Sequence, residues 1–80
     1  MREELRKWIE LTVKLFVDVP DKVKVEMVQG EQTTLYKVSC GKEDLGKVIG
    51  KQGGMARSLR AVILSVATKN SFRAVMDIVE

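Results

Sequence analysis

The chain has 80 residues, a length that suits one small domain with a single modest core and excludes a two-domain protein. Apolar residues make up 45% of it and charged residues 31%, which is the balance of a folded soluble protein and not of a disordered or low-complexity one. Its formal net charge is +3, with one cysteine and no histidine, so an internal disulfide, a thiolate metal cluster and a histidine-based site are excluded.

The first part of the chain predicts a helix followed by a hairpin. Residues 2–17 carry apolar side chains at helical spacing, with charged side chains opposite, which is typical of an amphipathic helix. Pro20 lies beyond its expected end, since proline cannot continue the hydrogen-bonded ladder. Residues 22–29 and 33–40 alternate as strands, and the short turn around Gly30 predicts an antiparallel hairpin. The helix positions expected to face the core are Leu5, Trp8, Ile9, Thr12, Val13 and Phe16.

The second part predicts two helices and a last strand. A short helix is expected at residues 43–49, a longer one at about 54–68 and a strand at 72–79. The order α-β-β-α-α-β predicts one α+β domain over residues 1–80, a three-stranded sheet covered on one face by three helices. The long helix is expected to bury a stripe consisting of Met55, Leu59, Val62, Ile63 and Val66.

A G-x-x-G turn separates the two expected helices. Gly50 and Gly53 bracket Lys51 and Gln52, and a glycine without a Cβ atom lets another backbone approach closely. The following helix would point its free N–H groups and positive dipole end toward the same place. Lys51 and the nearby Lys47 add positive charge, so the turn is a candidate contact for a nucleic-acid phosphate.

The segment around this turn carries basic residues and no acidic ones. No acidic residue lies between Asp44 and Asp77. Such clustering indicates a polyanion partner, and an ordinary solvated basic helix face is the open alternative. The basic residues of the segment are Lys47, Lys51, Arg57, Arg60, Lys69 and Arg73.

The run from Asp44 to Gly53, D-L-G-K-V-I-G-K-Q-G, resembles the signature of KH domains. The order of elements resembles the type II variant of that fold, and the match covers the whole chain. The run R-S-L-R at residues 57–60 is similar to the KhpA family, small bacterial proteins with a single KH domain.

This resemblance implies binding of single-stranded RNA, with about four nucleotides held in a groove. The G-x-x-G loop would contact the backbone of the RNA, and apolar residues would contact its bases. Val48 and Ile49 would form part of the groove floor, and ordinary core positions are the alternative for both. Helix geometry adds Arg57 and Arg60 as flanking phosphate contacts. The expected RNA-binding residues are therefore Lys47, Val48, Ile49, Gly50, Lys51, Gln52, Gly53, Arg57 and Arg60.

The resemblance also implies a cytoplasmic RNA chaperone or post-transcriptional regulator linked to cell shape. Its implied partners are a second copy of the chain, forming a homodimer, or a larger multi-module KH protein, forming a heteromer. Leu64, with Ala61, falls opposite the core stripe and is a candidate partner surface. The alternative function is a protein-interaction module that docks the larger RNA-binding partner, with RNA binding secondary.

An enzyme is not expected, and neither is a cofactor, a metal, a membrane or a small-molecule substrate. Residues 41–47 fit the first seven positions of a P-loop, but Val48 stands where a serine or threonine must ligate Mg²⁺. No nucleophile and base can be paired from the sequence.

One position departs from the family pattern. Gly54 stands where relatives often carry a basic residue, so the loop has lost one charge. Each neutralised phosphate of a single strand contributes roughly 0.7 to the log–log salt slope. We therefore expect weaker and less salt-sensitive binding than in a relative with arginine at this position.

Overall fold

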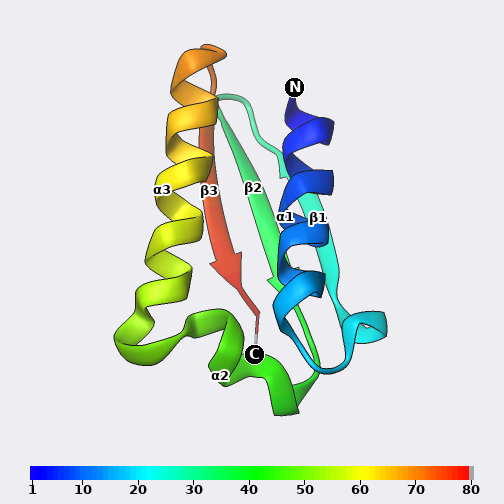
Figure 1. The fold of residues 1–80 in the computed structure, drawn as a ribbon. Helices are drawn as coiled ribbons and strands as arrows, with labels where there is room; N and C mark the ends of the chain where they lie inside the picture. Colours follow the sequence, from blue (N-terminus) through cyan, green and yellow to red (C-terminus); the bar gives the residue numbers. More distant parts are fainter. Residues whose placement is uncertain (80) are drawn as a thin grey trace.

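A computed structural model describes residues 1–79 and confirms the predicted α+β fold (Figure 1). The two long helices lie on the same face of the sheet, and the short helix crosses near their lower ends. Single turns of 3₁₀ helix lie at Pro20–Lys22, Lys42–Asp44 and Lys51–Gly53. The elements are α1 (Arg2–Phe16), β1 (Lys24–Gln29), β2 (Thr33–Ser39), α2 (Leu45–Ile49), α3 (Gly54–Lys69) and β3 (Arg73–Ile78).

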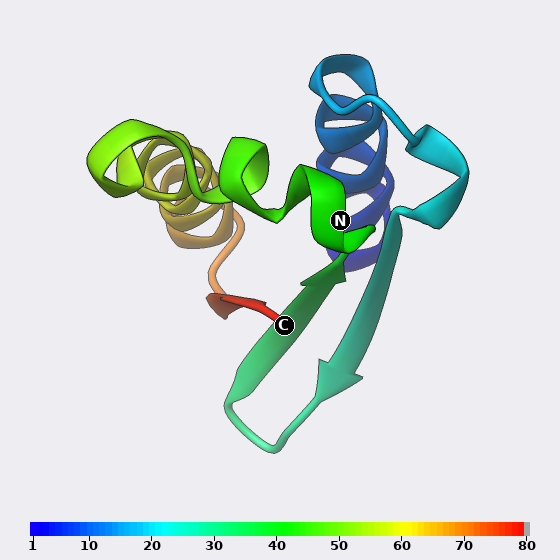
Figure 2. The same ribbon diagram turned by 90° about the horizontal axis from the view of Figure 1, so that it is seen from below.

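The sheet has the order β1-β2-β3, with β2 at its centre (Figure 2). β1 pairs antiparallel with β2 through the predicted hairpin, and β3 pairs parallel with β2 after the crossover through α2 and α3. Met27, Tyr36 and Met76 stand opposite one another in this register and point toward the helices. No helix of residues 1–79 covers the opposite face of the sheet.

The core lies between this sheet face and the helices. Tyr36 is fully buried, and its hydroxyl donates to the carbonyl oxygen of Arg2 at 2.8 Å. Burial raises the pKa of Tyr36. Cys40 is partly buried against the core, as expected for a small apolar residue, and burial raises the pKa of its thiol. The largest fully buried aliphatic side chains are Ile9, Val13, Val38, Val48 and Ile63.

Two predicted core positions are wrong. Trp8 is 37% exposed and Val62 is 41% exposed. α1 buries only the narrow stripe of Leu5, Ile9 and Val13, which leaves Trp8 on the edge of that stripe. α3 buries two alanines that the apolar pattern did not single out, and this turns Val62 away from the sheet toward α1. The buried residues of α3 are Ala56, Leu59, Ile63 and Ala67.

Across residues 1–79, no helix is both long and apolar enough to cross a membrane. No group of three or more histidine, cysteine, aspartate or glutamate side chains in this part of the chain could hold a metal ion.

Candidate nucleic-acid interface

The G-x-x-G loop joins α2 to α3 through a sharp reversal that depends on Gly50. The N–H of Gly50 donates to the carbonyl oxygen of Gly46 at 2.8 Å and closes the last turn of α2. Gly50 then adopts φ 83° and ψ 169°, a conformation that suits only glycine. A Cβ atom at Gly50 would lie 2.5 Å from the backbone nitrogen of Met55. Gly50 therefore allows the start of α3 to pack directly against the end of α2.

The other half of the loop is left-handed. Gln52 has φ 55° and ψ 30°, and Gly53 has φ 74° and ψ 11°. Arg57, in the first part of α3, donates from Nη1 to the carbonyl oxygen of Gln52 at 2.8 Å. A non-glycine residue in this region is strained unless its surroundings hold it, and Arg57 supplies such a contact. Sequence reasoning expected Arg57 to meet a phosphate, and the structure places its guanidinium on the loop backbone.

The loop presents positive groups to solvent. Lys51 and Gln52 are exposed at its tip. α3 begins at Gly54, directly after the loop, and has no acidic side chain in its first turn. The N–H groups of Gly53 and Gly54 donate to the loop carbonyl oxygens of Gly50 and Lys51, and the positive dipole end of this long helix lies at the loop without a neighbouring carboxylate on α3. This arrangement favours an anion such as a phosphate.

Lys47 points elsewhere. Its Nζ atom is 2.6 Å from Oδ2 of Asp18, in the connection that follows α1. The hydrogen bond to Asp18 raises the pKa of Lys47. The structure therefore pairs Lys47 with an acid, whereas Lys51 stays on the exposed loop.

A buried carboxylate fixes the position of α2. Asp44 is fully buried and accepts hydrogen bonds from the backbone N–H groups of Asp18 at 3.0 Å and Val19 at 2.9 Å. These two bonds, that of Asp18 first, hold the pKa of the Asp44 carboxyl below its ordinary value. Asp44 lies in the stretch where the sequence predicts the short helix. Its partners lie far away in the sequence, so the local pattern gave no sign of them.

The apolar residues before the loop divide between core and surface. Val48 is fully buried in the core, in agreement with the alternative of an ordinary core position. Ile49 is partly exposed at the end of α2. Of the two, only Ile49 is available to a base.

Arg60 and Leu64 lie on the side of α3 that faces the edge strand β3. Nε of Arg60 donates to the carbonyl oxygen of Met76 at 3.4 Å, a long contact that brings the guanidinium to the sheet edge. Leu64 is 61% exposed and follows Arg57 and Arg60 at helical spacing, so it lies on the same side as both arginines. Ala61 is also exposed. Leu64 and Ala61 are thus both exposed, and a partner surface at these residues stays a prediction.

Comparisons with known proteins identify one family and several relatives of similar length. The family model described as KhpA/KhpB, KH domain, matches residues 6–78. The RNA-binding protein KhpA of Aquifex aeolicus is 42% identical over 95% of this chain and 96% of its own. The RNA-binding proteins KhpA of Clostridium acetobutylicum and Chlamydia pneumoniae are 41% and 36% identical, over 94% and 95% of this chain and 100% and 97% of theirs. No solved structure matches the chain significantly.

Proposed function

This chain belongs to the KhpA/KhpB family of KH domains, and we propose that it is an RNA-binding protein without catalytic activity. Relatives that match nearly its full length carry the name RNA-binding protein KhpA. The proposed ligand is single-stranded RNA, held by its backbone at the G-x-x-G loop.

The conformation of the loop carries this proposal. Gly50 and Gly53 have positive φ and shape the sharp reversal of the loop, and Lys51 and Gln52 stand between them on the surface. The start of α3 adds its positive dipole end. Ile49 provides a partly exposed apolar contact for a base, and Arg57 holds the loop in its left-handed form.

Contacts between the loop and the RNA backbone discriminate little between RNA sequences. Backbone contacts fix the position of a strand and carry no sequence information directly. In the described residues, the only tryptophan and the only tyrosine lie away from the loop, on α1 and in the core, so neither offers a stacking platform there. We propose weak binding to many RNAs, which suits an RNA chaperone or post-transcriptional regulator in the cytoplasm with a role in cell shape.

The proposal includes association of the chain with a second copy or with a larger KH-type protein. Two copies, or one copy joined to a larger KH-type protein, would present more than one clamp to the same strand. The second clamp then binds at a high effective concentration, so overall affinity rises without new contacts. An interaction module with RNA binding secondary is the second candidate function, favoured by the exposed apolar side chains of Leu11 and Leu15 on α1.

Fluorescence anisotropy of a labelled single-stranded RNA tests the RNA-binding function. The wild type and the double variant Lys51→Asp/Gln52→Asp are titrated at two salt concentrations, and circular dichroism confirms that both are folded. We expect the wild type to bind more weakly at the higher salt concentration and the double variant to lose binding. Equal binding by both folded proteins, or binding by neither, would overturn the proposal and leave the interaction module.

A further inference from the structure

The side chain of Arg2 is held in place at the end of the molecule where α3 finishes and β3 begins. Its Nε atom donates to Oγ1 of the buried Thr34 at 3.1 Å, and the guanidinium carbon lies 4.6 Å from the centre of the Phe72 ring. A guanidinium above an aromatic face is attracted by the negative charge density of the ring. Because two contacts already restrain Arg2, little side-chain entropy is lost when it binds a ligand.

The outer nitrogen atoms of Arg2 have no partner in the described part of the chain, residues 1–79. Its side chain makes one hydrogen bond there, through Nε, and takes part in none of the ion pairs. Both Nη atoms can therefore donate to a ligand. A planar guanidinium matches the paired oxygen atoms of a phosphate, which favours arginine for bidentate recognition of that group.

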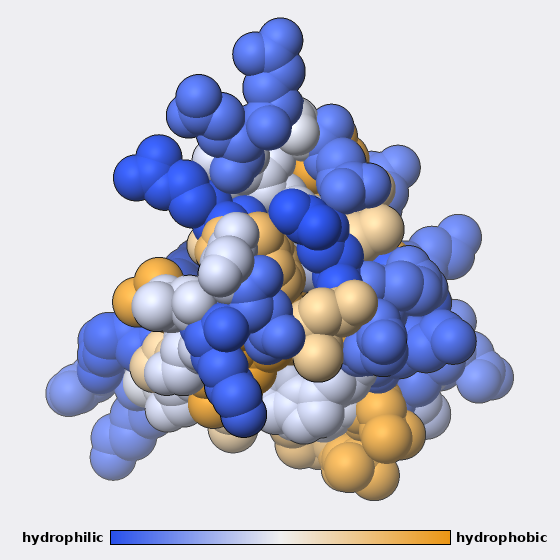
Figure 3. Space-filling model, turned by 90° about the horizontal axis from the view of Figure 1, so that it is seen from above, coloured by the Kyte–Doolittle hydropathy of each residue, from blue (hydrophilic) through white to orange (hydrophobic). Residues whose placement is uncertain are grey.

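Arg2 lines an open hollow that also contains Arg73. The hollow has a volume of about 560 Å³ and lies between the start of α1, the hairpin turn and the connection from α3 to β3. Seen from this end, hydrophilic residues cover most of the molecule (Figure 3). The two arginines and one acid, Glu31, give the hollow a net charge of +1, and no ion pair within residues 1–79 involves Arg73 or Glu31. Its neutral hydrogen-bonding side chains are Gln32, Thr68 and Ser71.

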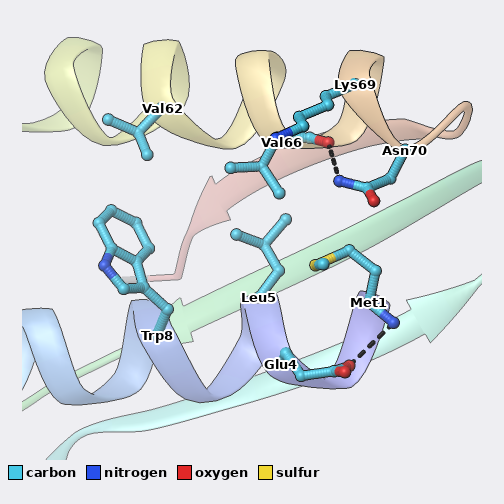
Figure 4. A pocket seen from close by; sticks show the side chains of 8 residues that line it. All are labelled: Met1, Glu4, Leu5, Trp8, Val62, Val66, Lys69 and Asn70. Carbon is cyan, nitrogen blue, oxygen red and sulfur yellow. Dashed lines mark hydrogen bonds and ion pairs between the residues drawn. The ribbon is translucent and has the colours of Figure 1, made fainter.

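The carbonyl groups at the end of α3 are paired where they adjoin this hollow. Such groups have no partner within their own helix, and unpaired they would repel an anion. The carbonyl oxygens of residues 66–68 each accept a hydrogen bond from an N–H group of residues 70–72, at 2.9–3.2 Å. The side-chain amide of Asn70 adds a second bond to the carbonyl oxygen of Val66 at 2.7 Å (Figure 4). The positive charge of the arginines is therefore not opposed by unpaired oxygen atoms of these residues.

Basic side chains follow one edge of the molecule from the G-x-x-G loop to the hollow. α3 has 16 residues and is about 24 Å long, with the loop at its start and the hollow at its end (Figure 1). Arg60, on α3 between them, reaches the backbone of Met76 on the edge strand β3. Arg73 is the first residue of the same strand. An RNA strand that leaves the loop along β3 would meet Arg60 first and then the hollow.

We propose that Arg2 and Arg73 bind a phosphodiester of the RNA strand that the G-x-x-G loop also holds. This inference rests on the proposed RNA binding and adds a second contact, at the other end of α3. Two sites on one strand act at a high effective concentration, so an RNA that reaches both binds more tightly than one that fills the loop alone. The contact leaves the apolar groove between α1 and α3 free, since the hollow shares no lining residue with that groove (Figure 4).

Fluorescence anisotropy with RNAs of two lengths tests this contact. One RNA has about four nucleotides, the number that a KH groove holds, and the other has about twelve. The short RNA reports on the loop alone, so loop variants are titrated with it. Arg2→Gln and Arg73→Gln should each weaken binding of the long RNA about threefold and lower its salt slope by roughly 0.7, with binding of the short RNA unchanged. Lys7→Gln removes a charge from an exposed position of α1 outside the hollow and is the matched control.

The second arginine variant keeps the test conclusive if Arg2→Gln fails to fold. Arg73→Gln leaves the contacts of Arg2 with Thr34 and Phe72 in place. Long-RNA binding that is unchanged in Arg73→Gln, or equally weakened in Lys7→Gln, would overturn the contact at the hollow. Binding of the short RNA that still depends on the loop would leave the proposed function standing in that case.

A free phosphate carries the same oxygen atoms as a phosphodiester, and NMR titrations of the ¹⁵N-labelled chain separate the two sources. We expect the amide signals of residues 68–73 to shift with the long RNA and much less with adenosine monophosphate at the same concentration. Equal shifts would assign the hollow to a free phosphate and overturn the RNA contact. A wild type that binds neither RNA would overturn the proposed function and this inference with it.

Discussion

Nζ of Lys47 lies 2.6 Å from Oδ2 of Asp18. This ion pair joins α2 to the connection after α1. The same connection donates two backbone hydrogen bonds to the buried Asp44. One short segment therefore both positions α2 and neutralises a lysine of the KH signature. The positive charge that remains at the loop tip is that of Lys51.

Replacing Asp18 by asparagine should release Lys47 to the RNA. The amide keeps the shape of the side chain and removes the negative charge that pairs with Lys47 and repels phosphate. We expect higher RNA affinity and, if Lys47 then neutralises a phosphate, a salt slope greater by roughly 0.7. Anisotropy titrations over a salt series measure both quantities. Glu31→Gln removes an acid in the hairpin turn as the control, and an equal gain in that variant would show only a general charge effect.

Gly50→Ala should damage both the loop and the fold. The strained φ of 83° costs about 1–3 kcal/mol for a residue with a side chain, and the contact with the backbone of Met55 adds to that cost. Urea unfolding followed by circular dichroism measures the loss. Gly46→Ala is the matched control, because a Cβ there meets no atom within 4 Å and alanine favours a helix. Equal stability of the two variants would contradict the assigned role of Gly50.

Gly54→Arg should strengthen RNA binding. Gly54 has helical φ and ψ, and a Cβ atom there meets nothing within 4 Å, so the arginine fits without strain. One added phosphate contact should steepen the salt slope by roughly 0.7. Ser65→Arg adds the same charge roughly three turns further along α3 and should leave the slope nearly unchanged. An unaltered slope in Gly54→Arg would show that this position does not meet the RNA backbone.

Asp44 should make the fold sensitive to acid. Its folded-state pKa is lowered, so its contribution to stability is complete above the unfolded pKa and is lost as the pH falls through the folded pKa. Asp44→Asn should therefore unfold at lower urea than the wild type at about pH 7, with a smaller difference at about pH 3. The control Asp77→Asn removes an exposed carboxylate on β3. A constant difference across this range would contradict the assignment.

Local patterns predicted the helices and strands, because the spacing of apolar residues and the positions of glycine and proline at turns are local properties of the sequence. Alternation marked residues 22–29 and 33–40 as strands, where the structure has Lys24–Gln29 and Thr33–Ser39, and the residues around Gly30 marked the turn between them. The position of the loop followed in the same way from its two glycines. The backbone of Gly50 confirms the need for glycine, since its φ is positive and Met55 occupies the space of a side chain.

Helix rotation and long-range polar contacts could not be predicted in the same way. Trp8 matched the apolar period, but the angle at which α1 meets the sheet decided which apolar residues became buried, and Trp8 was left at the edge. The bonds from Asp18 and Val19 to Asp44 join segments distant in the sequence, and no spacing rule brings them together. The pairing of Lys47 with Asp18 could not be predicted for the same reason.

The most direct test of the account is an NMR titration of the ¹⁵N-labelled chain with a short single-stranded RNA. We predict that amide shift changes concentrate at Ile49, the loop residues 50–53 and the first turn of α3, and that the Lys51→Asp/Gln52→Asp variant shows none of them. Changes confined to the open face of the sheet or to the exposed side of α1, or the same changes in the variant, would contradict a clamp at the G-x-x-G loop.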